Sequence, residues 1–112
     1  MKALPKTFIQ QVNQIIDQHL DDKHLLQLLE KKCQLSSSQI YRKIKQQTGH
    51  SPSMHIQHKR LQQAHLWILQ SDVKIAKIAK MVGFRQLAYF SRCFSKFYGY
   101  SPIFLRRQHP KK

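Results

Sequence analysis

Apolar side chains recur along this chain at intervals of three and four residues, the spacing that places them on one face of an α-helix. No segment alternates apolar and polar residues in the manner of a half-buried strand. The pattern predicts an all-α protein of about seven helices with short connections. The apolar stripes of the first six helices begin at Phe8, Leu25, Ile40, Leu61, Ile75 and Leu87, and Pro102 begins a short seventh helix that ends near Gln108.

The pattern between Ile40 and Pro52 occurs a second time, between Phe90 and Pro102. Each copy ends a helix with glycine, which adopts the left-handed conformation at little cost. Each then continues with Ser-Pro, a helix-capping serine followed by a proline at the first helical position. The repeat predicts two helix-turn-helix subdomains, residues 1–52 and 73–112, joined by a long connecting helix over residues 53–72.

The second helix of each predicted pair, about 37–48 and 86–98, has one apolar and one polar face. On the later helix, a helical wheel turns Leu87, Phe90, Phe94 and Phe97 inward. The outward positions of both helices are rich in hydrogen-bond donors and hold almost no acids. They are Ser38, Gln39, Arg42 and Gln46 on the first helix, and Arg85, Ala88, Tyr89, Arg92 and Lys96 on the second.

Charge is distributed unevenly along the chain, whose 112 residues have a formal net charge of +15. Residues 31–112 hold 17 of the 20 basic side chains and only one of the five acids. Such an excess attracts polyanions. Nucleic acid is therefore the first candidate partner, and an anionic membrane surface is the second. Five acids in total leave little material for catalysis by paired carboxylates.

A helix with one donor-rich face fits the major groove of B-DNA, where arginine pairs with guanine and glutamine pairs with adenine. Lysine and further arginine side chains neutralise phosphates, which fixes the register of the protein without selecting a sequence. The candidates for base contact are Ser38, Gln39, Arg42, Gln46, Gln86, Tyr89 and Arg92. The candidates for phosphate contact are Lys43, Lys45, Arg85 and Lys96.

Three motifs in order support a family resemblance. IAKMVGFRQLAYFSRCFSKFYGYSP, from Ile78 to Pro102, resembles the signature of the DNA-binding domain of AraC-type (AraC/XylS-type) bacterial transcription regulators. LSSSQIYRKIKQQTGHSP, from Leu35 to Pro52, is similar to the first motif of that family, in the form found in two-component members. KRLQQAHLWIL, from Lys59 to Leu69, matches its connecting helix.

The resemblance implies seven helices in a homeodomain-like arrangement, with the third and sixth helices entering successive major grooves of double-stranded DNA. A connecting helix of about 20 residues spans roughly 30 Å, close to the groove separation of about 34 Å. The resemblance also implies a cytoplasmic bacterial regulator, with RNA polymerase as a further candidate partner. Family members usually carry a sensor or dimerisation domain, which we expect to be missing from this chain.

The second motif departs from the family pattern at the start of its recognition helix. Ala88 stands where serine is usual, and it follows the apolar Leu87. We therefore hypothesise that the first motif makes most base contacts, through Ser38, Gln39 and Arg42, while the second contributes Arg92.

Several other functions are disfavoured. We find no pairing of a nucleophile with a base, no glycine-rich phosphate loop and no metal-binding set, so no enzyme, cofactor or metal site is expected. Cys33 and Cys93 lie in apolar helical patterns and are expected to be buried thiols. The main alternative is a non-specific basic protein that binds DNA or RNA. A cationic helix at a membrane surface ranks last, because each apolar face is expected to enter a core.

Overall fold

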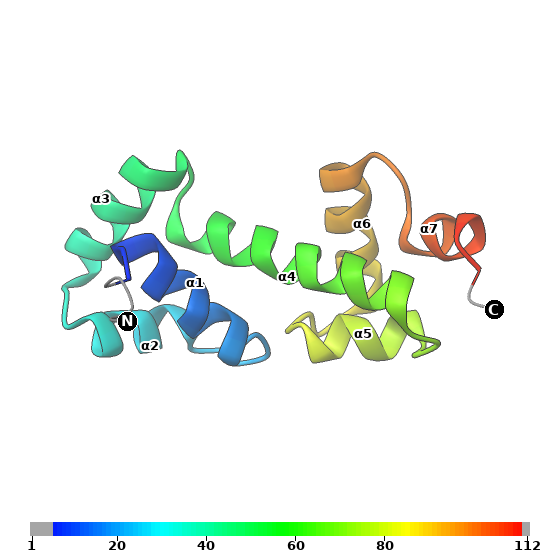
Figure 1. Ribbon diagram of the computed structural model, residues 1–112, viewed down its shortest axis with the longest axis horizontal. Helices are drawn as coiled ribbons and strands as arrows, with labels where there is room; N and C mark the ends of the chain where they lie inside the picture. Colours follow the sequence, from blue (N-terminus) through cyan, green and yellow to red (C-terminus); the bar gives the residue numbers. More distant parts are fainter. Residues whose placement is uncertain (1–5, 111–112) are drawn as a thin grey trace, which may run out of the picture. The chain divides into compact units, whose positions relative to one another are not determined.

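The computed structural model describes residues 6–110, which form seven α-helices and no strand (Figure 1). This confirms the predicted all-α, seven-helix fold. The helices are α1 (Phe8–Gln18), α2 (Leu25–Cys33), α3 (Ser37–Thr48), α4 (Pro52–Gln70), α5 (Ile75–Met81), α6 (Leu87–Tyr98) and α7 (Pro102–Gln108).

The chain packs as two compact units, Met1–Ile56 and Gln57–Lys112, and the division falls within α4. The three-part division into 1–52, 53–72 and 73–112 stays a prediction. In unit 1, α1 lies against α2 and α2 against α3 (Figure 1). The first unit encloses an aliphatic core made of Val12, Ile15, Ile16, Leu20, Leu25, Leu29, Ile40, Ile44 and Ile56.

Two capping boxes fix where helices of unit 1 begin. The Thr7 hydroxyl accepts from the backbone N–H of Gln10, and the Gln10 side chain accepts from the backbone N–H of Thr7. Ser36 and Gln39 form the same pair at the start of α3. Each box satisfies two backbone groups that a helix start would leave unpaired, so the polar sequence SSSQ starts α3 at a defined residue.

Unit 2 has a larger, partly aromatic core, and α5 packs against α6 and α6 against α7. Its buried apolar residues are Leu61, Ala64, Ile68, Ile78, Ala79, Val82, Phe84, Phe90, Phe94 and Leu105. The Arg106 guanidinium of α7 donates to the backbone carbonyls of Ile68, Ser71 and Val73. It thereby satisfies one carbonyl in the last turn of α4, which a helix C-terminus would leave unpaired, and two carbonyls in the loop that follows.

The two copies of the sequence Gly-x-Ser-Pro, where x is any residue, form the turns that the sequence predicts. Gly49 and Gly99 end α3 and α6 with φ angles of 79° and 82°. The hydroxyls of Ser51 and Ser101 then accept backbone N–H groups in the first turns of α4 and α7. The turns that follow α3 and α6 are therefore specified by the local sequence.

Replacing Gly99 by alanine should destabilise unit 2 by about 1–2 kcal/mol, the cost of holding an L-residue in the left-handed region. An added Cβ meets no atom within 4 Å, so no steric clash adds to that cost. Urea unfolding followed by fluorescence of Trp67, the only tryptophan and part of unit 2, measures the change. Gly99→Asn should cost less, because asparagine tolerates this conformation; equal losses for both variants would contradict the explanation.

Aromatic rings of α6 and the following turn surround His65 of α4. Its ring centroid lies 4.4 Å from that of Tyr98 and 6.0 Å from that of Phe94, and its Nε2 forms a 2.8 Å hydrogen bond with the Tyr100 hydroxyl. Burial lowers the pKa of His65 below its usual range, and the positive charge of His109 lowers it further. Folding of unit 2 therefore favours the neutral imidazole.

Unit 2 should lose stability as the pH falls below about 6.5, the ordinary pKa of histidine. In that range the unfolded chain binds a proton at residue 65 that the folded chain resists, so the free energy of unfolding falls with pH. We expect Trp67-monitored urea midpoints at about pH 7.5 and about pH 5.5 to differ less in His65→Gln than in the unsubstituted protein. An equal pH dependence in both proteins would show that His65 does not contribute.

Two predicted core positions of α6 are exposed. The prediction that Leu87 and Phe97 face inward is wrong, since they are 46% and 37% exposed. A helical wheel gives the direction of a side chain but not how far its neighbours extend along the helix. Leu87 is the first residue of α6, and Phe97 lies on its last turn, where its ring centroid is 4.5 Å from that of His58.

The two cysteines also lie nearer the surface than expected. Cys33 and Cys93 are half-buried free thiols. Burial raises the pKa of the Cys33 thiol, and the charge of Lys43 partly offsets that effect.

Candidate nucleic-acid interface

The polar face of α3 lies open to solvent. Every predicted contact residue on this helix is exposed, while Ile40 and Ile44 on the opposite face are fully buried. The exposed set is Ser38, Gln39, Arg42, Lys43, Lys45 and Gln46. The helix contains no acid, so its outer face presents donors and positive charge without an internal counterion.

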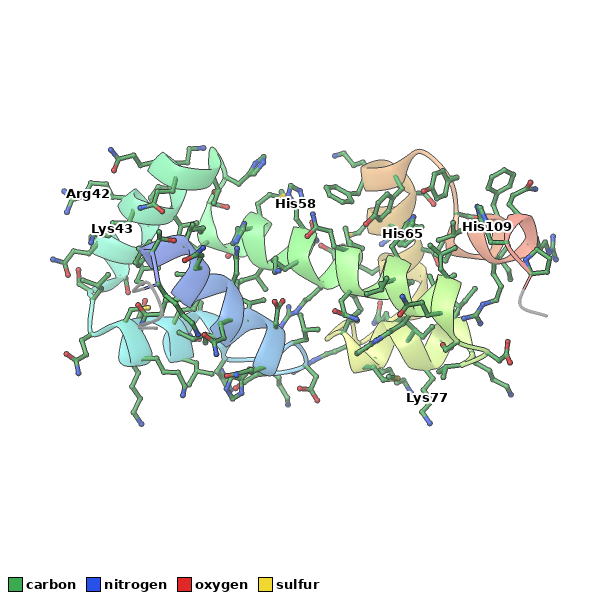
Figure 2. All side chains as sticks on the ribbon, viewed as in Figure 1. Arg42, Lys43, His58, His65, Lys77 and His109 are labelled. Carbon is green, nitrogen blue, oxygen red and sulfur yellow. The ribbon has the colours of Figure 1, made fainter. Side chains whose placement is uncertain are left out.

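Local contacts divide these α3 side chains into two kinds. The Gln39 side-chain oxygen accepts from the Ser36 backbone N–H at 2.9 Å, so in this conformation it serves the helix start. The Lys43 ammonium lies 5.2 Å from the Phe8 ring centroid, on the side of α3 nearest α1. Figure 2 shows Arg42 extending outward from α3. Arg42 is the single arginine of α3, and a guanidinium is the group that can make a two-pronged contact with guanine.

The polar face of α6 is exposed in the same way. Phe90 and Phe94 are fully buried on one side of the helix, and its other side and approach hold the predicted contact residues. Those exposed residues are Arg85, Gln86, Tyr89, Arg92 and Lys96. Gln86 caps α6 only through its backbone, since no side-chain capping bond forms there. Unlike Gln39, its amide has no capping role.

Tyr89 and Arg92 form a contact of their own. The Arg92 guanidinium carbon lies 5.8 Å from the Tyr89 ring centroid, a cation–π distance. The Tyr89 hydroxyl accepts from the Gln57 amide of α4 at 3.3 Å. Sequence reasoning missed Gln57, as it missed Phe8 beneath Lys43, because both act across long sequence separations that helical periodicity does not encode.

Within residues 6–110, no three His, Cys, Asp or Glu side chains gather in a group that could hold a metal ion. None of the helices drawn in Figure 1 is long and apolar enough to cross a lipid bilayer.

The two units therefore define a class of protein, in which helix-turn-helix units present donor-rich helices to DNA. A family model described as a helix-turn-helix domain matches residues 29–108. The chain belongs to the AraC-type helix-turn-helix family and is a DNA-binding domain of transcription regulators, a class of binding module and not of enzyme.

Curated relatives agree with this assignment. The chain is 33% identical over 91 residues to the MmsAB operon regulatory protein of Pseudomonas aeruginosa, covering 81% of this chain and 30% of that protein. It is 37% identical over 78 residues to the transcriptional activator RhaS of Mannheimia succiniciproducens, covering 70% of this chain and 29% of that protein. The chain thus spans about a third or less of the length of these relatives.

Solved structures share the fold over most of the chain. The C-terminal domain of the response regulator AraT from Geobacillus stearothermophilus matches with a TM-score of 0.84 and 27% identity, over 98% of this chain and 92% of that one. The C-terminal domain of the two-component response regulator YesN from Fusobacterium nucleatum matches with a TM-score of 0.77 and 29% identity, over 88% and 96%.

Proposed function

We propose that this domain recognises its operator by inserting α3 and α6 into major grooves of double-stranded DNA, one helix from each unit. The observation that carries the proposal is the repeated surface: each helix is anchored by two fully buried apolar residues and exposes donors on its other side. The proposed base contacts are made by Ser38, Gln39, Arg42, Gln46, Gln86, Tyr89 and Arg92.

We propose that α3 contributes more to base recognition than α6 does. Arg42 lies among polar neighbours on α3, whereas α6 begins with Leu87 and Ala88, which offer no hydrogen bond to a base edge. The capping role of Gln39 also matters, because a two-pronged contact with adenine uses the amide oxygen that Ser36 now occupies. We therefore rank Arg42 first among the reading residues and Arg92 second.

Lys43, Lys45, Arg85 and Lys96 are proposed to contact phosphates and so to position the two helices. Each neutralised phosphate should add about −0.9 to the slope of log K against log salt concentration. Replacement of one such lysine by alanine should weaken binding to all sequences alike.

The surrounding regulator is also proposed. We infer that this domain works with a sensing or dimerisation domain and acts in the bacterial cytoplasm, where the DNA lies. The two solved C-terminal domains belong to proteins named as response regulators, which favours a phosphorylation-linked sensor. Direct contact with RNA polymerase would let the bound regulator alter transcription.

A competition experiment separates this proposal from non-specific basic binding. A labelled duplex carrying the preferred site is displaced by the same unlabelled duplex or by mixed-sequence DNA. The salt concentration is about 150 mM, at which electrostatic attraction is largely screened beyond a Debye length of about 8 Å. Specific recognition predicts that at least about 10³-fold more mixed-sequence DNA is needed. Equal potency of the two competitors would favour the non-specific alternative.

A further inference from the structure

We propose that Gln57 of α4 is a positioning residue for base readout by Arg92, acting through the ring of Tyr89. The inference rests on the proposed function, in which Arg92 contacts a base. It adds a residue outside the recognition helix, from a helix that makes none of the proposed base contacts.

Gln57 fastens two successive turns of α6. Its Nε2 donates to the Tyr89 hydroxyl at 3.3 Å and to the Cys93 sulfur at 3.4 Å. Tyr89 and Cys93 are four residues apart on α6, so one amide group bridges both positions along one side of the helix. Gln57 and Cys93 are half-buried, which limits competition from water for these bonds.

The Tyr89 ring is held at more than one point. Its hydroxyl accepts from Gln57, and its ring centroid lies 5.9 Å from that of Phe84, which is only 6% exposed. The ring itself remains 47% exposed. The hydrogen bond to its hydroxyl and the contact with a buried ring restrict the Tyr89 side chain. Tyr89 therefore presents a partly exposed ring in a defined position on the surface of α6.

The guanidinium of Arg92 lies over this Tyr89 ring. The guanidinium carbon lies 5.8 Å from the Tyr89 ring centroid, and stacking of this kind restricts a long side chain that would otherwise sample many rotamers. A donor ordered before binding loses less conformational entropy when it contacts a base. The contacts therefore run from Gln57 to Tyr89 to Arg92, and Gln57 can act on base readout without contacting the base itself.

The test compares a matched control with two variants, each of which removes the hydrogen bond between Gln57 and Tyr89. Gln57→Ala removes the donor, and Tyr89→Phe removes the acceptor hydroxyl while it keeps the ring beneath Arg92. Gln62→Ala makes the same chemical change at an exposed position of the same helix. For each protein, affinities are measured for the preferred duplex and for duplexes changed at the base pair whose preference Arg92→Ala abolishes.

We expect Gln57→Ala to lower discrimination at that base pair by about 2- to 5-fold, the effect of an exposed cation–π contact. Tyr89→Phe should act in the same direction, and Gln62→Ala should have no effect. In an Arg92→Ala background, Gln57→Ala should change nothing further, because the group it positions is absent. Ring-current shifts of the Arg92 side-chain protons in the free protein should decrease in Gln57→Ala.

Two results would overturn the inference while the proposed function stands. One is unchanged discrimination in Gln57→Ala although Arg92→Ala relaxes it. The other is a loss of affinity for all duplexes alike that is explained by a lower urea midpoint, which would give Gln57 a purely structural role. If Arg92→Ala itself leaves discrimination unchanged, Arg92 does not contact a base, and both the proposed role of Arg92 and the inference are wrong.

Discussion

Replacing Arg42 by alanine is expected to weaken binding to the preferred duplex by about 5- to 150-fold, because a two-pronged contact with guanine contributes about 1–3 kcal/mol. Arg42 is exposed on the outer face of α3, directly between residues that face solvent, and the helix beneath it is anchored by Ile40 and Ile44. The loss should be confined to the preferred sequence. Fluorescence anisotropy with matched and mismatched duplexes measures both affinities.

The control for this prediction is Arg107→Ala, which removes an equal charge from an exposed position of α7. It should change both affinities by a small and equal factor. Arg92→Ala should reduce discrimination less than Arg42→Ala does. If Arg42→Ala weakened matched and mismatched duplexes equally, Arg42 would be a phosphate contact and the ranking of the two helices would be wrong.

Replacing Phe94 by alanine is expected to destabilise unit 2 by about 3–5 kcal/mol, because the change leaves a cavity in a packed core. Phe94 is fully buried. Its ring centroid lies 5.7 Å from that of Phe90, 4.7 Å from that of Tyr98 and 6.0 Å from that of His65. The loss is large compared with the total stability of a small unit, and Trp67 fluorescence during urea unfolding measures it.

Phe104→Ala provides the matched control, since it deletes the same side chain where it is 50% exposed. Surface substitutions of this kind change stability by about 0.5 kcal/mol. If Phe94→Ala leaves too little folded protein to measure, Phe94→Leu gives a second test, with an expected loss of about 1–2 kcal/mol. Equal losses for Phe94→Ala and Phe104→Ala would contradict the account of the unit 2 core.

The fold was predictable because its signals are local. Glycine at the helix ends and Ser-Pro at the next helix starts specify the turns, and the structure forms them at Gly49 and Gly99. Buried positions such as Ile40, Ile44, Phe90 and Phe94 follow from helical periodicity. The bounds predicted for the two recognition helices, 37–48 and 86–98, accordingly differ from those of α3 and α6 by at most one residue.

The details of the candidate interface were less predictable, because they depend on contacts between distant segments. The support of Tyr89 by Gln57 joins residues 32 positions apart, and Arg106 reaches carbonyls more than 30 positions away. Periodicity also placed Leu87 and Phe97 in the core, although both are exposed, one at the first residue of α6 and one in its last turn. The interface prediction therefore identified the exposed donors but not the side chains that hold them.

The most direct test of the central claim is selection of bound sequences from a random duplex pool at about 150 mM salt, repeated with Arg42→Ala and Arg92→Ala. Reading by both recognition helices predicts two enriched blocks about one helical turn apart. Arg42→Ala should remove the stronger block, and Arg92→Ala should weaken the other. Absence of any enriched sequence would contradict the claim that α3 and α6 recognise bases.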